Sequence, residues 1–172
     1  LELAEHDLGF TPRSIGLDIA KWNAWFDWKC NNLNAFAGRL VSMIREASPG
    51  TLVSASVYPY PDSVLVRMQD WSKWAVSGWL DFVVPLTNTR VADLVDTLVR
   101  AAQGFAGAKT LVVAGIDAAS IPNTKSSAPA LAGLVDAARA AGAYGVSIYD
   151  ARALSDEALS ALLDGPFCAP TE

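Results

Sequence analysis

The chain has 172 residues and a mass of 18.2 kDa, which suits one domain that buries about 70% of the surface its unfolded chain exposes. Charged residues make up only 18%, below the roughly 25% of an average globular chain, and hydrophobic residues make up 52%. This composition excludes a disordered chain and predicts more covered surface than a free monomer has. The net charge of −5 argues against a nucleic-acid partner, because no stripe of Lys or Arg could neutralise phosphates.

Few side chains are suited to metal or redox chemistry. Cys30 and Cys168 lie far apart in the sequence, and His6 is the one histidine, so we expect no metal site and no cofactor. No apolar run approaches the 18 or so residues of a membrane span, and no signal peptide is recognisable. Because the chain begins at Leu1 without a methionine, we expect it to be a fragment, and export cannot be judged from this end.

Residues 1–20 show no periodicity, which predicts a loop or an incoming connection before four βα units at 21–172. Helical spacing begins near Asn23 and ends near Ala47, before Ser48-Pro49-Gly50. The apolar residues that share one face of this helix are Leu33, Phe36, Leu40, Val41 and Ile44. A β-rich run over 51–57 follows, and a loop of tyrosines and prolines occupies 58–62.

The same alternation then continues along the chain. The sequence predicts a helix over 67–77, a strand over 79–86, a helix around 91–99 and a strand over 110–116. A polar loop at 117–128 leads to a helix that buries Leu131, Leu134 and Val135, and 143–149 is the last strand. Ser155 is a good N-cap for a final helix, with Asp156 and Glu157 in the first turn, where the helix dipole favours negative charge.

Four strands that alternate with helices predict an α/β fold with a parallel sheet. The strands are continuous apolar runs, begin about 30 residues apart, and match the spacing of a (β/α)8 barrel. We therefore expect strands in sequential order, with helices on one side of the sheet and an apolar surface on the other. A flavodoxin-like, doubly wound sheet has the same spacing and stays open as an alternative, although no glycine-rich dinucleotide fingerprint follows a strand.

One segment resembles a known family. The stretch Asp70-Trp-Ser-Lys-Trp-Ala-Val-Ser-Gly-Trp-Leu-Asp-Phe-Val-Val-Pro85 is similar to the D-W-x-x-W-x-x-x-G-W-(I/L)-D-(Y/F)-(V)-x-P segment around the sixth strand of the glycosyl-hydrolase-like ten family. The matching residues are Asp70, Trp71, Trp74, Gly78, Trp79, Asp81 and Pro85. Trp25 and Trp28-Lys29 before the first strand, and Gly142-Ala-Tyr-Gly-Val-Ser-Ile-Tyr149, fit the same family, so the resemblance runs from about residue 22 to 165.

The resemblance implies that this chain is the second half of a TIM barrel, namely strands five to eight. It implies a carbohydrate ligand, a partner that is either the N-terminal half or a second copy, and a place outside the cytoplasm or at the cell envelope. The family's expected acid lies after the fourth strand, in a D-G-(I/V)-H-x-D type segment, and nothing here matches it. Pro85-Leu-Thr-Asn-Thr89 and Tyr58-Pro-Tyr-Pro61 depart from the family's P-Q-x-Y and P-F-G segments, so substrate contacts are not carried over there.

The candidate site lies at the carboxyl ends of the strands, where (β/α)8 barrels place their reactive groups. Rings stack on sugar faces and polar groups bond hydroxyls, which suits four residues to substrate binding: Tyr58, Tyr60, Asn88 and Tyr149. Glycoside cleavage needs two carboxyl groups, about 5 Å apart for retention or about 6.5–9.5 Å for inversion. Asp117 and Asp150 end neighbouring strands and form the one pair considered for catalysis.

Structural roles compete with these functional ones. Asp117 follows a glycine and suits an Asx-turn, Asp150 equally suits a loop cap, and Asp81 begins its strand at the opposite face. The tryptophans at 71, 74 and 79 are expected in the core, those at 22, 25 and 28 are expected to pack, and His6 to be solvated. Two functions follow: a glycoside hydrolase-like enzyme acting on a polysaccharide, or a non-catalytic carbohydrate-binding or scaffold half-barrel.

Overall fold

The computed structural model describes residues 1–120 and 128–168. Its helices before the sheet are α1 (Glu2–Leu8), the 3₁₀ turn η1 (Pro12–Ser14) and the long α2 (Ile19–Ala47). The strands are β1 (Ser54–Val57), β2 (Phe82–Pro85), β3 (Leu111–Asp117) and β4 (Gly145–Tyr149). The remaining elements are α3 (Asp62–Arg67), α4 (Trp71–Val76), α5 (Ala92–Ala106), η2 (Ala118–Ser120), α6 (Ala128–Ala140), η4 (Ala151–Ala153) and α7 (Asp156–Asp164).

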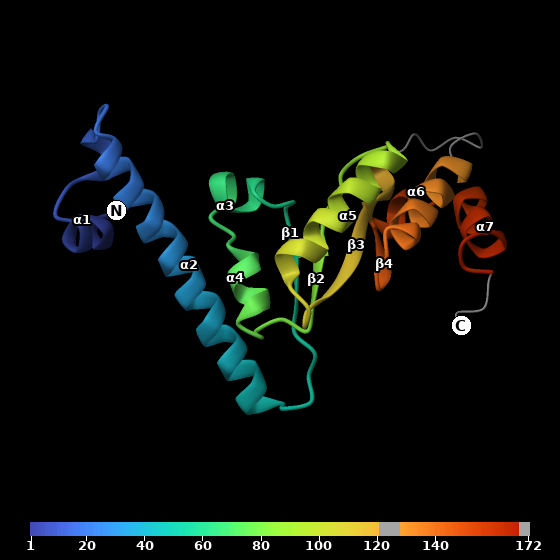
Figure 1. The fold of residues 1–172 in the computed structure, drawn as a ribbon, viewed down its shortest axis with the longest axis horizontal. Helices are drawn as coiled ribbons and strands as arrows, with labels where there is room; N and C mark the ends of the chain where they lie inside the picture. Colours follow the sequence, from blue (N-terminus) through green and yellow to red (C-terminus); the bar gives the residue numbers. More distant parts are fainter. Residues whose placement is uncertain (121–127, 169–172) are drawn as a thin grey trace.

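The four strands form one parallel sheet in the order β1-β2-β3-β4, as predicted. Figure 1 shows the strands alternating with helices, from α2 at one end of the molecule to α7 at the other. The 2-1-3-4 order of the doubly wound alternative is therefore wrong for this chain. An α/β fold with sequential βα units is confirmed, and each strand begins and ends within a few residues of its predicted limits.

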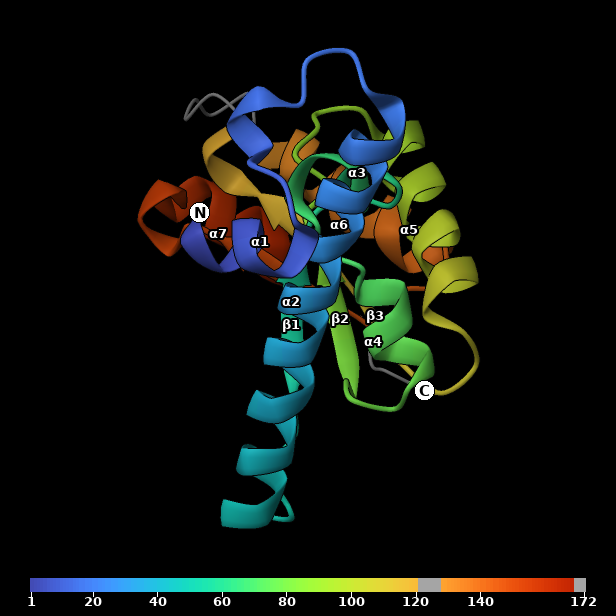
Figure 2. The same ribbon diagram turned by 90° about the vertical axis from the view of Figure 1, so that its left-hand side faces the viewer.

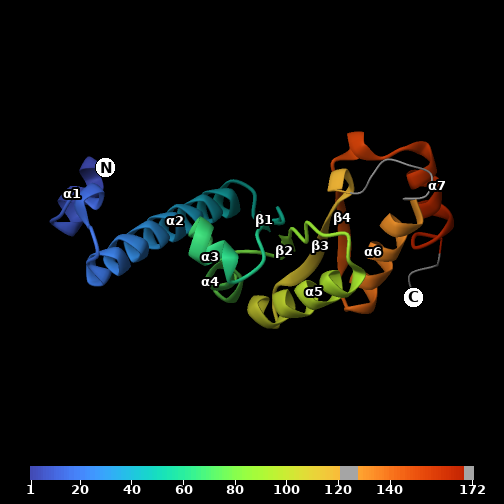
Figure 3. The same ribbon diagram turned by 90° about the horizontal axis from the view of Figure 1, so that it is seen from above.

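One face of the sheet is covered by helices. Val57, Val83 and Val112 point to this face and are buried against α4, α5 and α6, and Figure 3 shows α5 and α6 on the same side of the strands. Trp71 and Trp74 belong to this core, and Trp79 packs against it, as predicted. Because the helices follow one another along the same side, the hydrophobic core is a single continuous layer.

Among the described residues no helix covers the other face of the sheet, and the prediction that this face is apolar is only partly right. The central strands place Phe82, Val84 and Val113 there, but the edge strands carry exposed serines. These serines are Ser54 and Ser56 on β1 and Ser147 on β4. Two parallel edges, one on β1 and one on β4, bound this uncovered face.

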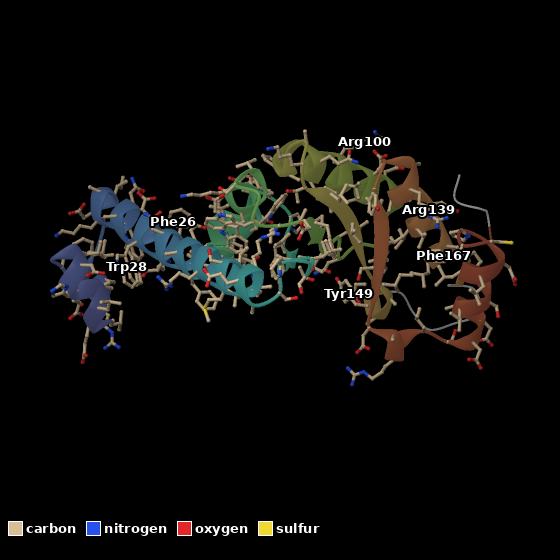
Figure 4. All side chains as sticks on the ribbon, turned by 90° about the horizontal axis from the view of Figure 1, so that it is seen from below. Phe26, Trp28, Arg100, Arg139, Tyr149 and Phe167 are labelled. Carbon is tan, nitrogen blue, oxygen red and sulfur yellow. The ribbon has the colours of Figure 1, made fainter. Side chains whose placement is uncertain are left out.

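Residues 1–20 were predicted to be a loop or an incoming connection, and a loop is wrong for Glu2–Leu8, which form helix α1. Helix α1 and turn η1 precede α2, which begins at Ile19 because the Asp18 side chain accepts a hydrogen bond from the Lys21 amide. The α1–α2 hairpin is held where Trp28 Nε1 donates to Asp7 Oδ2 at 2.9 Å and the Trp25 and Trp28 rings stack 5.2 Å apart. Figure 2 shows α1 lying across the start of α2, and Figure 4 labels Trp28 at this contact.

The helix predicted over 67–77 is shorter, because only α4 (Trp71–Val76) lies within that range, and the preceding helix α3 (Asp62–Arg67) was not predicted. Met68 ends α3 in the left-handed conformation, with φ of 58°, and the Asp70 side chain caps the start of α4 by accepting from the Lys73 amide at 3.4 Å. The break between α3 and α4 turns Trp71 inward, where its indole donates to the Tyr58 carbonyl at 3.0 Å.

Candidate functional site

The carboxyl ends of the four strands meet along one rim of the sheet. Tyr58 follows β1, Asn88 lies three residues after β2, Asp117 ends β3 and Tyr149 ends β4. Asp117 and Tyr149 are direct partners in the β3–β4 register. Parallel strands bring such positions to one side of a sheet, and the sequence predicted these four residues for the site on that reasoning.

Tyr149 is the centre of this cluster. Its hydroxyl donates a hydrogen bond to Asn88 Oδ1, which joins the ends of β4 and β2 across β3. Burial, with the nearby charges of Asp117 and Tyr58 acting in the same direction, raises the pKa of Tyr149 to about 12. The phenol therefore stays neutral at physiological pH and can act as both donor and acceptor of hydrogen bonds.

Tyr58 is held on the same rim by its neighbours. The Arg67 guanidinium lies over its ring, 4.1 Å from the centroid, and the Gln69 side chain accepts from its amide at 3.4 Å. Arg67 was not predicted as a site residue, since the sequence placed it at the start of a helix, whereas it is the last residue of α3. The arrangement adds a cation beside an aromatic ring on the rim.

Asp117 makes the turn that the sequence predicted for it. Its Oδ1 accepts a hydrogen bond from the Ala119 amide at 2.9 Å, which is the spacing of an Asx-turn, and it opens η2. Its carboxylate also lies near enough to Tyr149 to oppose ionisation of that phenol. Asp117 thus has a structural contact and a place in the cluster. The rest of the predicted loop, residues 121–127, lies outside the described part of the chain.

Asp150 caps the short helix η4 and pairs with its own neighbour. Its carboxylate accepts from the Arg152 amide at 3.0 Å and from Arg152 Nε at 2.8 Å, and these bonds to Arg152 lower the pKa of Asp150. A carboxyl group whose pKa is lowered is a poor general acid near neutral pH. The loop-cap role is present, whereas the catalytic role stays a prediction.

Tyr60 does not join the cluster. Its ring packs edge-on against Trp71, with centroids 5.7 Å apart, and against Phe105 at 4.3 Å. Burial raises the pKa of its phenol, with nearby Asp70 raising it further. The proline after Tyr60 is joined by a cis peptide bond. The structure therefore places this predicted substrate-binding residue between α4 and α5, away from Tyr149.

At the amino ends of the strands, Asp81 has a structural role, as expected. Its Oδ2 accepts from the Val53 amide at 2.7 Å, and Arg45 pairs with the same oxygen at 3.4 Å. His6 is exposed and contacts Asp7. Within the described residues, no three His, Cys, Asp or Glu side chains are grouped as metal ligands are, and none of the helices there is long and apolar enough to cross a bilayer.

Comparisons with known proteins do not add to this description. No protein-family model matches the chain, and neither a curated protein nor a solved structure matches it. The resemblance to the glycosyl-hydrolase-like ten family therefore rests on the sequence segment 70–85 and the order of the elements around it.

Proposed function

We propose that this chain is one half of a (β/α)8 barrel and supplies one wall of a carbohydrate-binding cleft at the carboxyl ends of its strands. The sheet supports the barrel half. Four parallel strands follow in sequential order, one face is packed under helices, and the uncovered face ends in two unpaired edges, among the described residues. A complete barrel has eight such strands and encloses the face that is uncovered here.

The observation that carries the binding role is the joined cluster of Tyr149, Asn88, Asp117 and Tyr58. Two rings offer surfaces for the apolar face of a sugar, while an amide, a phenol and a carboxylate offer the donors and acceptors that hydroxyl groups require. The Tyr149–Asn88 bond fixes the positions of both side chains before a ligand arrives, which lowers the ordering cost of binding.

Catalysis is the second candidate function, with Asp117 as the candidate catalytic carboxylate of this chain. A glycosidase needs two carboxyl groups on either side of the scissile bond. Asp150 is bound to Arg152 and favours its charged form, so it suits a general acid poorly. In this proposal Asp117 supplies one carboxylate and the acid comes from outside this chain, after the fourth barrel strand. Binding needs only the residues present here, and for that reason it is the better supported function.

Titration calorimetry of the complete protein with cellohexaose, chitohexaose and maltohexaose tests the proposal. We expect one of these probes to bind, and Tyr149→Phe to weaken it by up to about tenfold, the scale of one neutral hydrogen bond. Asp81→Asn is the matched control, since Asp81 lies at the opposite ends of the strands and should leave binding unchanged.

Measuring the hydrolysis of the bound probe distinguishes the two candidate functions. If Asp117 is catalytic, Asp117→Asn should lower hydrolysis of the bound probe by about a hundredfold or more, and Asp150→Asn should not. Binding without any hydrolysis would leave the carbohydrate-binding function alone. Equal binding by the wild type and Tyr149→Phe, or no binding of any of the three probes, would contradict the proposed site.

A further inference from the structure

A groove lies on the outside of the helical layer, between α2 and α4. Figure 1 shows α4 beside α2, and the groove between them has a volume of about 680 Å³. Residues from α2 form most of its wall, and Lys73 of α4 and Trp79 complete it. None of its lining residues belongs to a strand, so the groove is separate from the rim formed by the carboxyl ends of the strands.

The charged groups of the groove are all cationic. Arg39 and Lys73 line it, and no Asp or Glu does, although the chain as a whole carries a net charge of −5. In the part of the chain that the structure describes, neither cation is paired with a carboxylate within 4.0 Å. An anion in the groove would therefore gain charge-assisted hydrogen bonds without first breaking an ion pair.

Asn34 supplies a third donor from the floor of the groove. It is only 5% exposed, and its Oδ1 accepts from Trp74 Nε1 at 2.6 Å. Because an indole nitrogen can only donate, this bond fixes the orientation of the amide and turns Nδ2 the other way. Among the described residues Nδ2 has no hydrogen-bond partner, and it is not sealed from solvent as Ser63 Oγ is. The Asn34 side-chain amide is therefore a buried hydrogen-bond donor at the cationic groove, and it has no acceptor among the described residues.

The rest of the wall is apolar. The ring of Trp79 lies against α2 at Gly38, so close that a β-carbon at that position would be 2.9 Å from it. Met43 lies one turn further along α2 and lines the same groove. A ligand can therefore place an apolar body on Trp79 and Met43 while its charged end meets Arg39, Lys73 and Asn34.

We propose that this groove binds a small organic anion, a carboxylate or phosphate ester attached to an apolar or aromatic body. Three donors and no acidic group select for negative charge, and the indole wall selects for an apolar body over an inorganic ion. The site is separate from the carboxyl ends of the strands, and it is absent from the functions that the sequence predicted.

The test is a ¹H–¹⁵N NMR titration of the full chain with phenyl phosphate and with benzoate. We expect saturable shifts of the Asn34 side-chain amide and the Trp79 indole, and about tenfold weaker binding in Lys73→Gln and in Arg39→Gln, the scale of one charge-assisted contact. Both cations are exposed, so these variants should keep the fold. Tighter binding of one probe distinguishes the phosphate from the carboxylate as the preferred group.

Matched controls distinguish binding at this groove from nonspecific attraction of an anion to a positively charged surface. Lys109→Gln makes the same charge change at an exposed position outside the groove and should leave binding unchanged. Benzyl alcohol has the same ring without the charge and should bind at least tenfold more weakly than phenyl phosphate. Shifts that never saturate, equal weakening in Lys109→Gln, or equal binding of benzyl alcohol would each overturn the proposal.

Discussion

Tyr149 differs from an ordinary tyrosine in its environment, and this difference can be measured. Burial raises its pKa to about 12, against about 10 for a tyrosine in water. We expect the absorbance of tyrosinate near 295 nm to show one late step that is missing in Tyr149→Phe. A difference titration between the two proteins should have its midpoint near pH 12. A midpoint near pH 10 would mean that Tyr149 is not buried beside Asp117.

The raised pKa of Tyr149 also predicts how the free energy of unfolding changes with pH. Between about pH 10 and 12 the unfolded chain has lost this proton and the folded chain keeps it, so the unfolded state binds fewer protons. The free energy of unfolding therefore falls as pH rises through this window, and the contribution is fully present below pH 10. Tyr149→Phe should remove this part of the alkaline decline.

At the scale of single residues, the sequence predicted strand-end positions better than side-chain directions. Tyr58, Asn88, Asp117 and Tyr149 lie on one rim because a parallel sheet places strand ends together. Tyr60 has the same position in the sequence pattern, yet it packs on Phe105, which lies 45 residues away and which no local pattern connects to it. Side-chain partners distant in sequence were the part that could not be predicted.

At the scale of elements, Ser155 is a cap whose strength can be tested. Its side-chain oxygen accepts from the Ala158 amide at 3.2 Å and begins α7 where the sequence predicted. Ser155→Ala should lower the free energy of unfolding by about 1 kcal/mol in urea denaturation. Ser160→Ala is the matched control, because Ser160 is exposed within the same helix and alanine is the better helix former there.

Ser160→Ala should be neutral or slightly stabilising. An equal loss in both variants would mean that Ser155 acts through general surface effects, and no loss in Ser155→Ala would mean that α7 does not need this cap. Helix α7 is also tied to the rest of the molecule at its far end, where the Arg139 guanidinium of α6 lies 4.8 Å from the ring centroid of Phe167 (Figure 4). The loss of unfolding free energy in Ser155→Ala should therefore stay near about 1 kcal/mol, and helix α7 should remain folded.

Elements with strong periodicity and clear caps were predictable, and elements set by tertiary contacts were not. The strands and α5, α6 and α7 lie where apolar runs and caps indicated. Helix α1 was missed, because it depends on packing against α2 through the Trp28–Asp7 bond, and its own sequence has little amphipathic pattern. Helix α3 was missed because it has only six residues and directly follows the loop of tyrosines and prolines at 58–62.

At the scale of the whole molecule, the uncovered face and the two strand edges predict association. Unpaired edges present backbone donors and acceptors, and Phe82 and Val84 lie on the face between them. Helix α2 and the start of β1 share a groove lined by Phe36, Leu40 and Val53, which adds apolar surface beside the β1 edge. The proposed partner completes the sheet at both edges, as the N-terminal half or a second copy.

Light scattering of the chain in dilute buffer should therefore report a dimer or, when the N-terminal half is supplied, a one-to-one complex. Ser147→Arg should abolish this association, because it places a charge on the uncovered face of an edge strand and at a position already exposed in the single chain. Ala101→Arg, on the exposed surface of α5, makes the same charge change away from both edges and should leave the mass unchanged. A monomeric wild type that binds no N-terminal half, or equal masses for the wild type and Ser147→Arg, would contradict the half-barrel.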